Sequence, residues 1–284
     1  MQLSKISQKA IRFSLKKLTK DHNDGKSKYG GHPAINSLKE WPIQENGEPM
    51  DFIGQINFGE LNKKLANNKN TIELLPKEGI LMFFIDDEKM LGHKDYFAFV
   101  YQTKEDTRSE LKLPPQQGSF TPFPPHALVP EIIDSYPLDL SEKDLQIAGI
   151  KPVDFTDEMK DEYRNKYTFD SYHQLFGYPY PIQDDPCFDV LNGLGEIPQL
   201  KKRSDFKTNK AYEAWKKTER EKVMQERTKS YEKKKKDWTL LWQIPSEEKT
   251  FGYWGDNGNI YIMIETAKLK KNDFSNLQVT WQTS

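Results

Sequence analysis

The alternation of apolar and polar residues predicts short β-strands along much of the chain. Residues 11–15 (Ile-Arg-Phe-Ser-Leu) alternate with period two, which is typical of a half-buried strand. Residues 41–44 and 50–58 are apolar segments that flank Asn46-Gly47, a pair that tolerates positive φ, and this arrangement predicts a hairpin. In its second strand we expect four apolar side chains on one face: Met50, Phe52, Ile56 and Phe58.

Further strands are predicted where aromatic and β-branched residues cluster, at 97–101, 238–244, 259–265 and 277–281. A different pattern occupies residues 113–130, which contain six prolines in 18 residues. Because proline removes ladder donors and favours extended polyproline-type structure, we predict a connector along the surface there.

Two segments carry helical signals. Thr156 precedes two acidic residues, which predicts a capped helix that runs to about residue 167. Residues 207–236 contain no Gly or Pro and many Glu, Lys and Arg, so they are expected to form one long helix. Its apolar residues make only a thin stripe, which predicts a surface position with a narrow contact.

A short ordered pattern occurs twice in the chain. Each copy has a Gly-x-Pro turn, an apolar strand with a Gln-Ile step, and a Gly-led apolar strand closed by an acidic residue. The copies cover 29–33, 52–56 and 79–86, and then 175–179, 240–244 and 258–265. Such self-similarity is typical of one unit used twice. We therefore predict an α+β fold, mostly antiparallel sheet, in a single domain over 1–284 with pseudo-repeated halves at roughly 1–110 and 170–284.

Composition narrows the protein class. Aromatic residues make up 12% of the 284 residues, enough to build a buried core although hydrophobic residues are only 36%. The longest apolar run, residues 80–85, is far below the roughly 20 residues of a membrane span. The one cysteine, Cys187, allows neither an internal disulfide nor a zinc site with other thiols. We expect a soluble cytoplasmic protein that has no membrane partner.

Charge is concentrated in the predicted long helix. Residues 201–236 hold 15 basic and 6 acidic residues, a balance of +9, in a chain whose net charge is −1. A basic helix with Tyr212 and Trp215 is one way to bind nucleic acid. The interspersed glutamates instead favour a solvated helix with internal ion pairs, so nucleic-acid binding is only an alternative here.

Several ordered motifs resemble a known family. They are residues 27–33 (SKYGGHP), 40–42 (EWP), 47–49 (GEP), 52–57 (FIGQIN), 75–79 (LPKEG), 173–179 (HQLFGYP) with 182–183 (IQ), and 254–258 (WGDNG). Their order resembles that of the YwqG-like proteins, a largely bacterial family of unknown function, over nearly the whole chain. The resemblance implies an α+β fold with much antiparallel sheet. It brings no established activity, cofactor or catalytic residue. The frequent position of such families near polymorphic toxin loci implies an immunity or interaction role.

The chemistry-bearing residues leave an enzymatic alternative open. His32 and His173 each stand near a Gly-x-Pro turn, and imidazole is a usual general base near neutral pH. A hydrolase or transferase could use His173 with Asp184, Asp185 or Asp256. Cys187 lies among acidic residues, which raise a thiol's pKa rather than activate it. Residues 256–259 (Asp-Asn-Gly-Asn) lack the ligand spacing of a calcium loop, and we predict a turn there with no metal or cofactor.

The leading prediction is a non-enzymatic binding protein for a small ligand or a protein partner. Gln55 and Gln243 occupy the same place in both copies, where each is expected to bridge its strand to a neighbouring backbone. Aromatic residues beside the turns, and the run 178–181 (Tyr-Pro-Tyr-Pro), are suited to line a groove. We predict the site between the two halves, at Trp41, His173, Gln183, Trp254 and Asp256.

Overall fold

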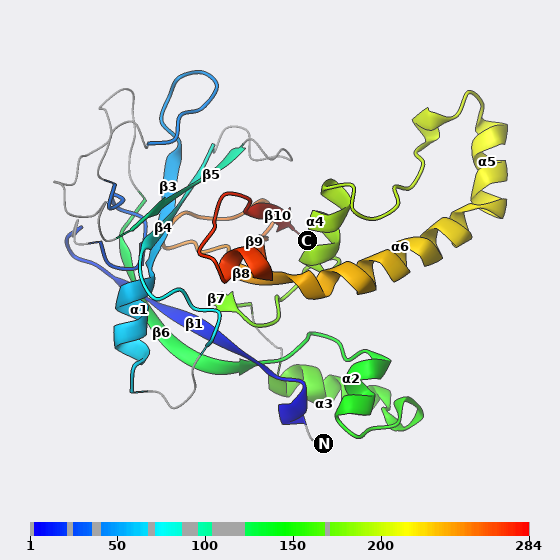
Figure 1. Ribbon diagram of the computed structural model, residues 1–284, viewed down its shortest axis with the longest axis horizontal. Coiled ribbons are helices and arrows are strands. Elements are labelled where there is room, and N and C mark those ends of the chain that lie inside the picture. Colours follow the sequence, from blue (N-terminus) through cyan, green and yellow to red (C-terminus); the bar gives the residue numbers. More distant parts are fainter. Residues whose placement is uncertain are drawn as a thin grey trace.

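The computed structural model describes residues 3–21, 25–35, 41–67, 72–86, 96–103, 123–167 and 171–283. Its strands form one antiparallel sheet of ten, in the order β10-β9-β8-β7-β1-β6-β2-β3-β4-β5 (Figure 1). The strands are β1 (Gln8–Lys17), β2 (Lys28–Tyr29), β3 (Asp51–Asn57), β4 (Ile80–Ile85), β5 (Phe97–Gln102), β6 (His126–Ser135), β7 (His173–Phe176), β8 (Trp238–Pro245), β9 (Asn259–Glu265) and β10 (Gln278–Gln282). The helices are α1 (Phe58–Leu65), α2 (Glu142–Ile147), α3 (Asp157–Tyr167), α4 (Pro186–Gly193), α5 (Asn209–Thr218), α6 (Arg220–Lys234) and α7 (Thr266–Leu269). The predicted α+β class is confirmed.

The sheet curves until its two edge strands approach each other. Phe97 and Phe99 of β5 line the same cavity as Val279 of β10. The side chains enclosed by this nearly closed sheet form the main apolar core, which includes Trp242 and Phe83. Burial of these large rings is the main source of stability for the sheet.

The centre of the sheet joins the two ends of the chain. β1 pairs along its whole length with β6, and on its other side with β7. β6 in turn pairs with β2. From this central pair, β2 to β5 follow outward in one direction and β7 to β10 in the other. If the chain is divided into β1–β5 and β6–β10, the first strand of each part lies beside strands of the other part. β1 lies between β6 and β7, and β6 lies between β1 and β2.

Two places in the sheet have the same local geometry. Gln55 Oε1 accepts from the Ala34 N–H (2.8 Å) while its Nε2 donates to the Lys26 carbonyl (2.7 Å). Gln243 Oε1 accepts from the Tyr180 N–H (2.8 Å) while its Nε2 donates to the Tyr172 carbonyl (2.9 Å). The predicted bridging role of both amides is confirmed.

The neighbouring backbone matches as well. Gly30 and Gly31 have φ of 60° and 66°, and Phe176 and Gly177 have φ of 61° and 70°. The register of β3 against β4 shifts between Phe52 and Gly54, and that of β8 against β9 shifts between Leu240 and Trp242. Each bulge lies directly before the bridging glutamine.

The hairpin predicted around Asn46-Gly47 is only partly correct. In its first segment, Ile43 makes one isolated bridge to Pro49 and no strand forms. The expected common face is wrong too, because Met50 and Phe52 pack in one cluster whereas Ile56 and Phe58 pack in the main core. The bulge after Phe52 adds a residue, and this reverses which face the following side chains point to.

The prediction of a surface connector over 113–130 is wrong at its C-terminal end, because β6 begins at His126 and contains Pro130. Residues 113–122 of that prediction lie outside the described residues. Pro130 is tolerated because β2 reaches only Ala127 on that side of β6. Pro130 lies beyond the end of β2, where no paired strand would accept a hydrogen bond from a backbone N–H on that side of β6. The missing N–H of the proline therefore costs no hydrogen bond of the sheet.

The helix predicted after Thr156 is confirmed as α3, whose first turn is capped by Thr156 Oγ1 accepting from the Met159 N–H (3.3 Å). The single helix expected over 207–236 is instead two, α5 and α6, with a break at Glu219. The two parts pack on different partners: Trp215 stacks near Phe206, whereas Tyr231 contacts Phe188 of α4. No apolar stripe runs along both α5 and α6, so no shared packing surface holds the two helices on one axis.

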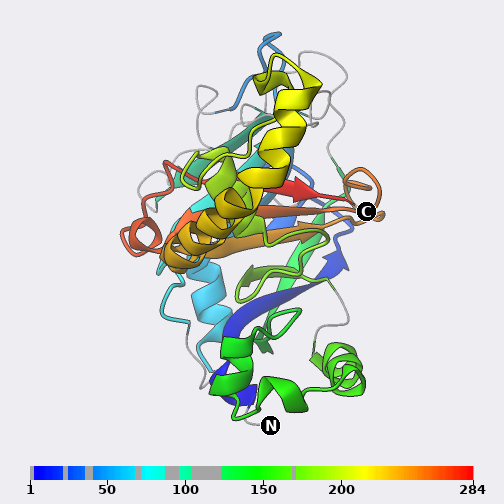
Figure 2. The ribbon, with the colours of Figure 1, turned by 90° about the vertical axis from the view of Figure 1, so that its right-hand side faces the viewer.

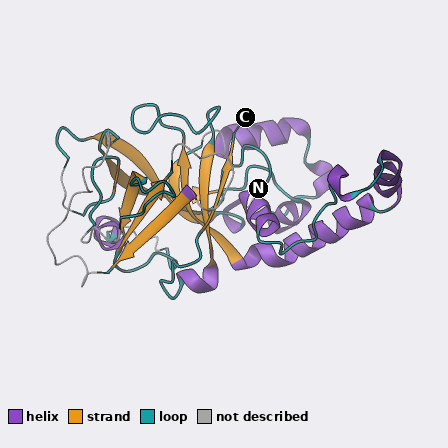
Figure 3. Cartoon of the chain, turned by 90° about the horizontal axis from the view of Figure 1, so that it is seen from above, coloured by secondary structure: helices purple, strands orange, loops and turns teal. Residues whose placement is uncertain are grey.

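Helices α2, α3, α5 and α6 extend beyond the sheet, whereas α4 packs on β8 and β9 through Leu191 and Leu240. Figures 1 and 3 show α6 running away from the strands and carrying α5 at its far end. Figure 2 shows α2 and α3 beside the start of β1 at the bottom of the view, whereas α5 lies at the top. Leu3 and Ile6 pack there against Leu145 and Tyr163. None of the described helices is both long and apolar enough to cross a membrane.

Candidate functional site

A cavity of about 690 Å³ opens between β1, β6, β7 and the segment after β8. We call it the histidine pocket. Its lining is Phe13, Ser14, Leu15, Lys17, His126, His173, Glu247 and Lys249.

The central strands place its two histidines on one face, four residues apart along β1. In the antiparallel register, His173 of β7 lies opposite Phe13, and His126 of β6 lies opposite Lys17. β1 therefore runs between the strands that carry the two imidazoles, and Phe13, Leu15 and Lys17 lie on the same face as both histidines. These residues are far apart in the sequence, and only strand pairing makes them neighbours.

A chain of buried hydrogen bonds orients His173. Trp242 Nε1 lies 3.0 Å from the Tyr29 hydroxyl, which lies 3.1 Å from His173 Nδ1. Indole N–H can only donate, so the Tyr29 oxygen accepts from it and its own O–H is available to donate to Nδ1. We assign the proton of neutral His173 to Nε2 on this geometry. Gly54 makes room for Tyr29, because a Cβ there would lie 2.5 Å from Tyr29 Cδ1.

The Nε2 side of His173 faces a carboxylate. Nε2 lies 3.7 Å from Glu247 Oε2. Burial lowers the pKa of His173, and this outweighs the opposing effect of Glu247, so the imidazole is neutral near pH 7. The hydrogen bond with His173 lowers the pKa of Glu247, which stays ionised. Burial also raises the pKa of Tyr29, which keeps its proton.

His126 is hydrogen-bonded so that its proton lies on the other ring nitrogen from that of His173. Its Nδ1 lies 3.0 Å from the Pro124 carbonyl, which can only accept, so neutral His126 carries its proton on Nδ1. Its Nε2 is then an acceptor. A ligand in the pocket therefore meets one donor, the His173 Nε2–H that also faces Glu247, and one acceptor, His126 Nε2.

The charges around the pocket favour an anionic group. Lys17 and Lys249 are exposed at its edge, and Glu247 is the one carboxylate among the described residues of its lining. Two ammonium groups against one carboxylate leave a local excess of positive charge. A ligand with a carboxylate or phosphate would be attracted to this edge.

Among the residues that the structure describes in this lining, none is an activated nucleophile. Ser14 is among the described lining residues, but it alternates with Phe13 and Leu15 along β1, so its hydroxyl points to the other face of the strand. Cys187 lies elsewhere, in the cluster beneath α4, where burial raises its pKa to about 12. In the part of the chain that the structure describes, no three His, Cys, Asp or Glu side chains are placed to hold a metal ion.

Of the five residues predicted to bind a ligand, His173 lines this pocket. Trp254 is joined to it through Phe251, which stacks on Trp254 (4.6 Å between ring centroids) and meets the His173 ring edge-on (6.4 Å). Trp41 is buried in another cluster, where it packs on Phe84.

The other two predicted residues lie near the C-terminal strand. The Gln183 N–H donates to Gln282 Oε1 (3.1 Å) and its Nε2 donates to the Thr283 carbonyl (2.8 Å). Asp256 is exposed in the turn before β9. Among the described cavities, none is lined by all five predicted residues, and their joint role in binding stays a prediction.

The acid beside His173 is Glu247 and not one of the aspartates that the sequence offered. Asp185 caps α4 by accepting from the Cys187 N–H (2.9 Å), a role that the Asp-Pro step at the helix start could have revealed. His32 does have an acid nearby, since its Nδ1 lies 2.7 Å from Asp21 Oδ2, with Lys28 on the same carboxylate.

Sequence reasoning missed Tyr29, His126, Glu247, Lys17 and Lys249. Tyr29 stood within a noted motif, but nothing marked it as a partner of His173. No periodic signal could have found the set, because it is drawn from three strands and a loop that are distant in sequence.

Comparison with family models gives a match over most of the chain. A family model described as Domain of unknown function (DUF1963) matches residues 27–283. No curated protein matches the chain.

Proposed function

The chain belongs to this family of unknown function, and from the histidine pocket we propose that it is a non-enzymatic binding protein for a small anionic ligand. The observation that carries the proposal is the fixed orientation of neutral His173 at a cavity bordered by Lys17 and Lys249. Pockets with a few converging polar groups and shifted pKa values are where ligands usually bind.

The pocket is organised before any ligand arrives. The Trp242, Tyr29 and His173 side chains are buried and hydrogen-bonded to one another, so little side-chain freedom is left to lose on binding. The absence of an activated nucleophile among the described lining residues supports binding over covalent catalysis.

The test is isothermal titration of the full chain with succinate, citrate and inorganic phosphate. We expect at least one to bind with a Kd below about 1 mM, and the double variant Lys17→Ala/Lys249→Ala to weaken it by about tenfold. Lys229→Ala, which removes an exposed lysine on α6, is the matched control and should change nothing. If none of the three probes binds at 10 mM (about ten times that Kd), or if the double variant binds as well as the parent, the proposal fails.

One observation supports acid–base catalysis as a second candidate. Glu247 and His173 form an acid–imidazole pair at a cavity, which is the geometry that a hydrolase or transferase would need. Glu247→Gln distinguishes the candidates: a binding protein keeps or gains anion affinity when this carboxylate is removed, whereas an enzyme loses turnover.

We also propose that the chain is a duplicated unit whose halves exchange their first strands. The support is the matching of bridging glutamines, positive-φ turns and bulges about a centre formed by β1 and β6. A toxin-immunity role stays a prediction, and a toxin gene beside the gene for this chain would support it.

A further inference from the structure

A second cavity, of about 290 Å³, lies on the other face of the central strands. Its residues Arg12 and Gln174 alternate along β1 and β7 with Phe13 and His173, so they point away from the histidine pocket. We call it the tyrosine pocket. The other residues that line it are Ile133, Asp134, Ser135, Tyr136, Leu138, Lys166, Tyr167, Tyr172, Tyr178, Pro179 and Tyr180.

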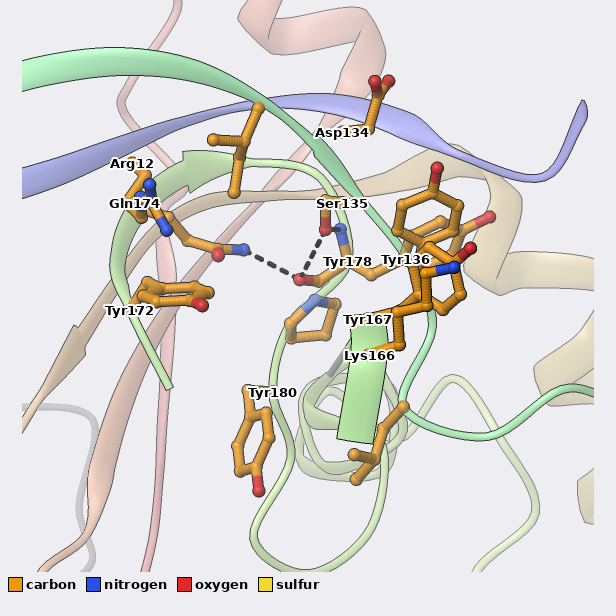
Figure 4. A pocket seen from close by; sticks show the side chains of 13 residues that line it. Arg12, Asp134, Ser135, Tyr136, Lys166, Tyr167, Tyr172, Gln174, Tyr178 and Tyr180 are labelled. Atoms are coloured by element: carbon orange, nitrogen blue, oxygen red, sulfur yellow. Dashed lines mark hydrogen bonds between the residues drawn. The ribbon is translucent and has the colours of Figure 1, made fainter. Parts of the chain in front are cut away.

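Aromatic rings stand on two sides of this cavity. Figure 4 shows Tyr172 and Tyr180 on one side, and Tyr136 and Tyr167 on the other. The Tyr136 and Tyr167 rings pack together with centroids 4.8 Å apart. The Arg12 guanidinium lies 4.9 Å from the centroid of the Tyr172 ring and helps to hold it in place. The run 178–181 that the sequence singled out therefore contributes to a pocket.

Between these rings, Gln174 and Ser135 have their donors already in use. Gln174 Nε2 donates to the carbonyls of Phe176 (3.1 Å) and Tyr178 (2.7 Å), which fixes its amide and leaves Oε1 as the available end (Figure 4). Ser135 Oγ accepts from the Tyr178 N–H (2.9 Å) and donates to the Tyr178 carbonyl (3.4 Å), so its hydrogen is already used. Next to Gln174, a ligand is therefore favoured that brings an N–H or O–H donor to Oε1.

Among the described residues of the lining, the one charge without an ion-pair partner belongs to a lysine. Arg12 is paired with Glu131 (2.6 Å) and Asp134 with Lys9 (2.8 Å). Lys166 forms no ion pair with any residue that the structure describes, and its ammonium lies 5.3 Å from the centroid of the Tyr167 ring. A cationic ligand would be repelled by Lys166, whereas a phosphate would be attracted to it.

We propose that the tyrosine pocket binds a nucleoside monophosphate whose base carries an exocyclic amino group. The flat base lies between the tyrosines, since stacking on aromatic rings is how proteins hold unpaired bases. The amino group donates to Gln174 Oε1, and the phosphate contacts Lys166. This site is separate from the histidine pocket and does not depend on the function proposed for it.

The test is isothermal titration of the full chain with AMP, CMP, UMP and adenosine. AMP and CMP are expected to bind, and UMP to bind at least tenfold more weakly because its base has no exocyclic amino group. Adenosine should also bind more weakly than AMP, and Lys166→Ala should remove the difference between them.

Variants separate loss of the site from loss of folding. Tyr172→Ala should abolish AMP binding, Tyr172→Phe should retain it because the ring is kept, and Tyr253→Ala, which removes an exposed tyrosine elsewhere, should have no effect. Absence of AMP and CMP binding at 10 mM would overturn the inference, as would equal affinity for UMP. So would loss of AMP binding in Lys17→Ala/Lys249→Ala, which would place the nucleotide in the histidine pocket.

Discussion

Gln55 and Gln243 show how one residue type can fix a turn against a strand. Each amide is fully buried and uses both ends, one on a backbone N–H and one on a carbonyl. An amide can do this without charge, whereas a carboxylate could not donate and an ammonium could not accept. The position therefore requires glutamine for geometric reasons.

We predict that Gln55→Ala and Gln243→Ala each lower the free energy of unfolding by about 2–4 kcal/mol. Each leaves a backbone N–H and a backbone carbonyl unpaired, at about 1–2 kcal/mol per group, the lower part of the usual range because most of these hydrogen bonds are only partly buried. The measurement is urea unfolding at pH 7.5. Gln183→Ala, which removes an exposed amide, should cost less than about 0.5 kcal/mol. Losses for Gln55→Ala and Gln243→Ala that match Gln183→Ala would contradict the bridging role.

His173 makes stability depend on pH. Its pKa in the folded chain is held below the ordinary value of 6.5 by burial, so below that pH the unfolded chain takes up a proton that the folded chain refuses. The stability that this group contributes is complete above pH 6.5 and is lost as the pH falls toward its folded pKa.

The expected slope is about 1.4 kcal/mol per pH unit below that point, from one differential proton. Urea unfolding between pH 5 and 7.5 measures this slope. The range lies above the lowered pKa of Glu247, so this carboxylate stays ionised in the folded chain throughout. His173→Gln should be less stable at pH 7.5 yet show a flatter profile. Parallel profiles for the two proteins would rule out His173 as the cause.

At the scale of elements, α6 is attached to the body at few points. Its mainly polar surface offers little to bury, and the buried Arg227 is its principal anchor. The Arg227 guanidinium donates to the Pro198 carbonyl and to Asn192 Oδ1 (3.0 Å), and it lies 5.0 Å from the centroid of the Phe188 ring. These contacts join α6 to α4 and to the segment that follows it.

Arg227→Ala should therefore loosen α6 while leaving the sheet intact. Charge-assisted hydrogen bonds of this kind are worth about 1.5–3 kcal/mol, so amide exchange in Arg220–Lys234 should accelerate by about tenfold or more. Exchange in β8 and β9 should not change. Lys229→Ala on the exposed side of α6 is the control, and equal exchange in both variants would show that Arg227 is not the anchor.

At the scale of the molecule, the two ends of the chain depend on each other at the centre of the sheet. Both neighbours of β1, namely β6 and β7, come from the C-terminal part. The N-terminal part alone would expose the two unpaired edges of a ten-residue strand.

Fragments 1–112 and 113–284 should accordingly fold together but not apart. We expect each fragment expressed alone to lack a cooperative unfolding transition, and the co-expressed pair to form a 1:1 complex that has one. Circular dichroism and analytical ultracentrifugation provide the measurements. A monomeric, cooperatively folded fragment 1–112 would contradict the exchanged-strand arrangement.

The sequence by itself determined the type and approximate position of most strands, the capped helix α3 and the repeated glutamine bridges, because alternation, capping residues and repeated motifs act over short distances. It did not determine the faces of β3, the break between α5 and α6, or Pro130 within a strand. Those depend on a bulge, on different packing partners and on where β2 ends.

Only the tertiary structure decided the two pockets. Antiparallel pairing of β1 with β6 and β7 brings His126, Lys17 and His173 together on one face, and Arg12 and Gln174 onto the other. No local pattern encodes that arrangement, because it arises when distant strands meet in a single register and bury their common face.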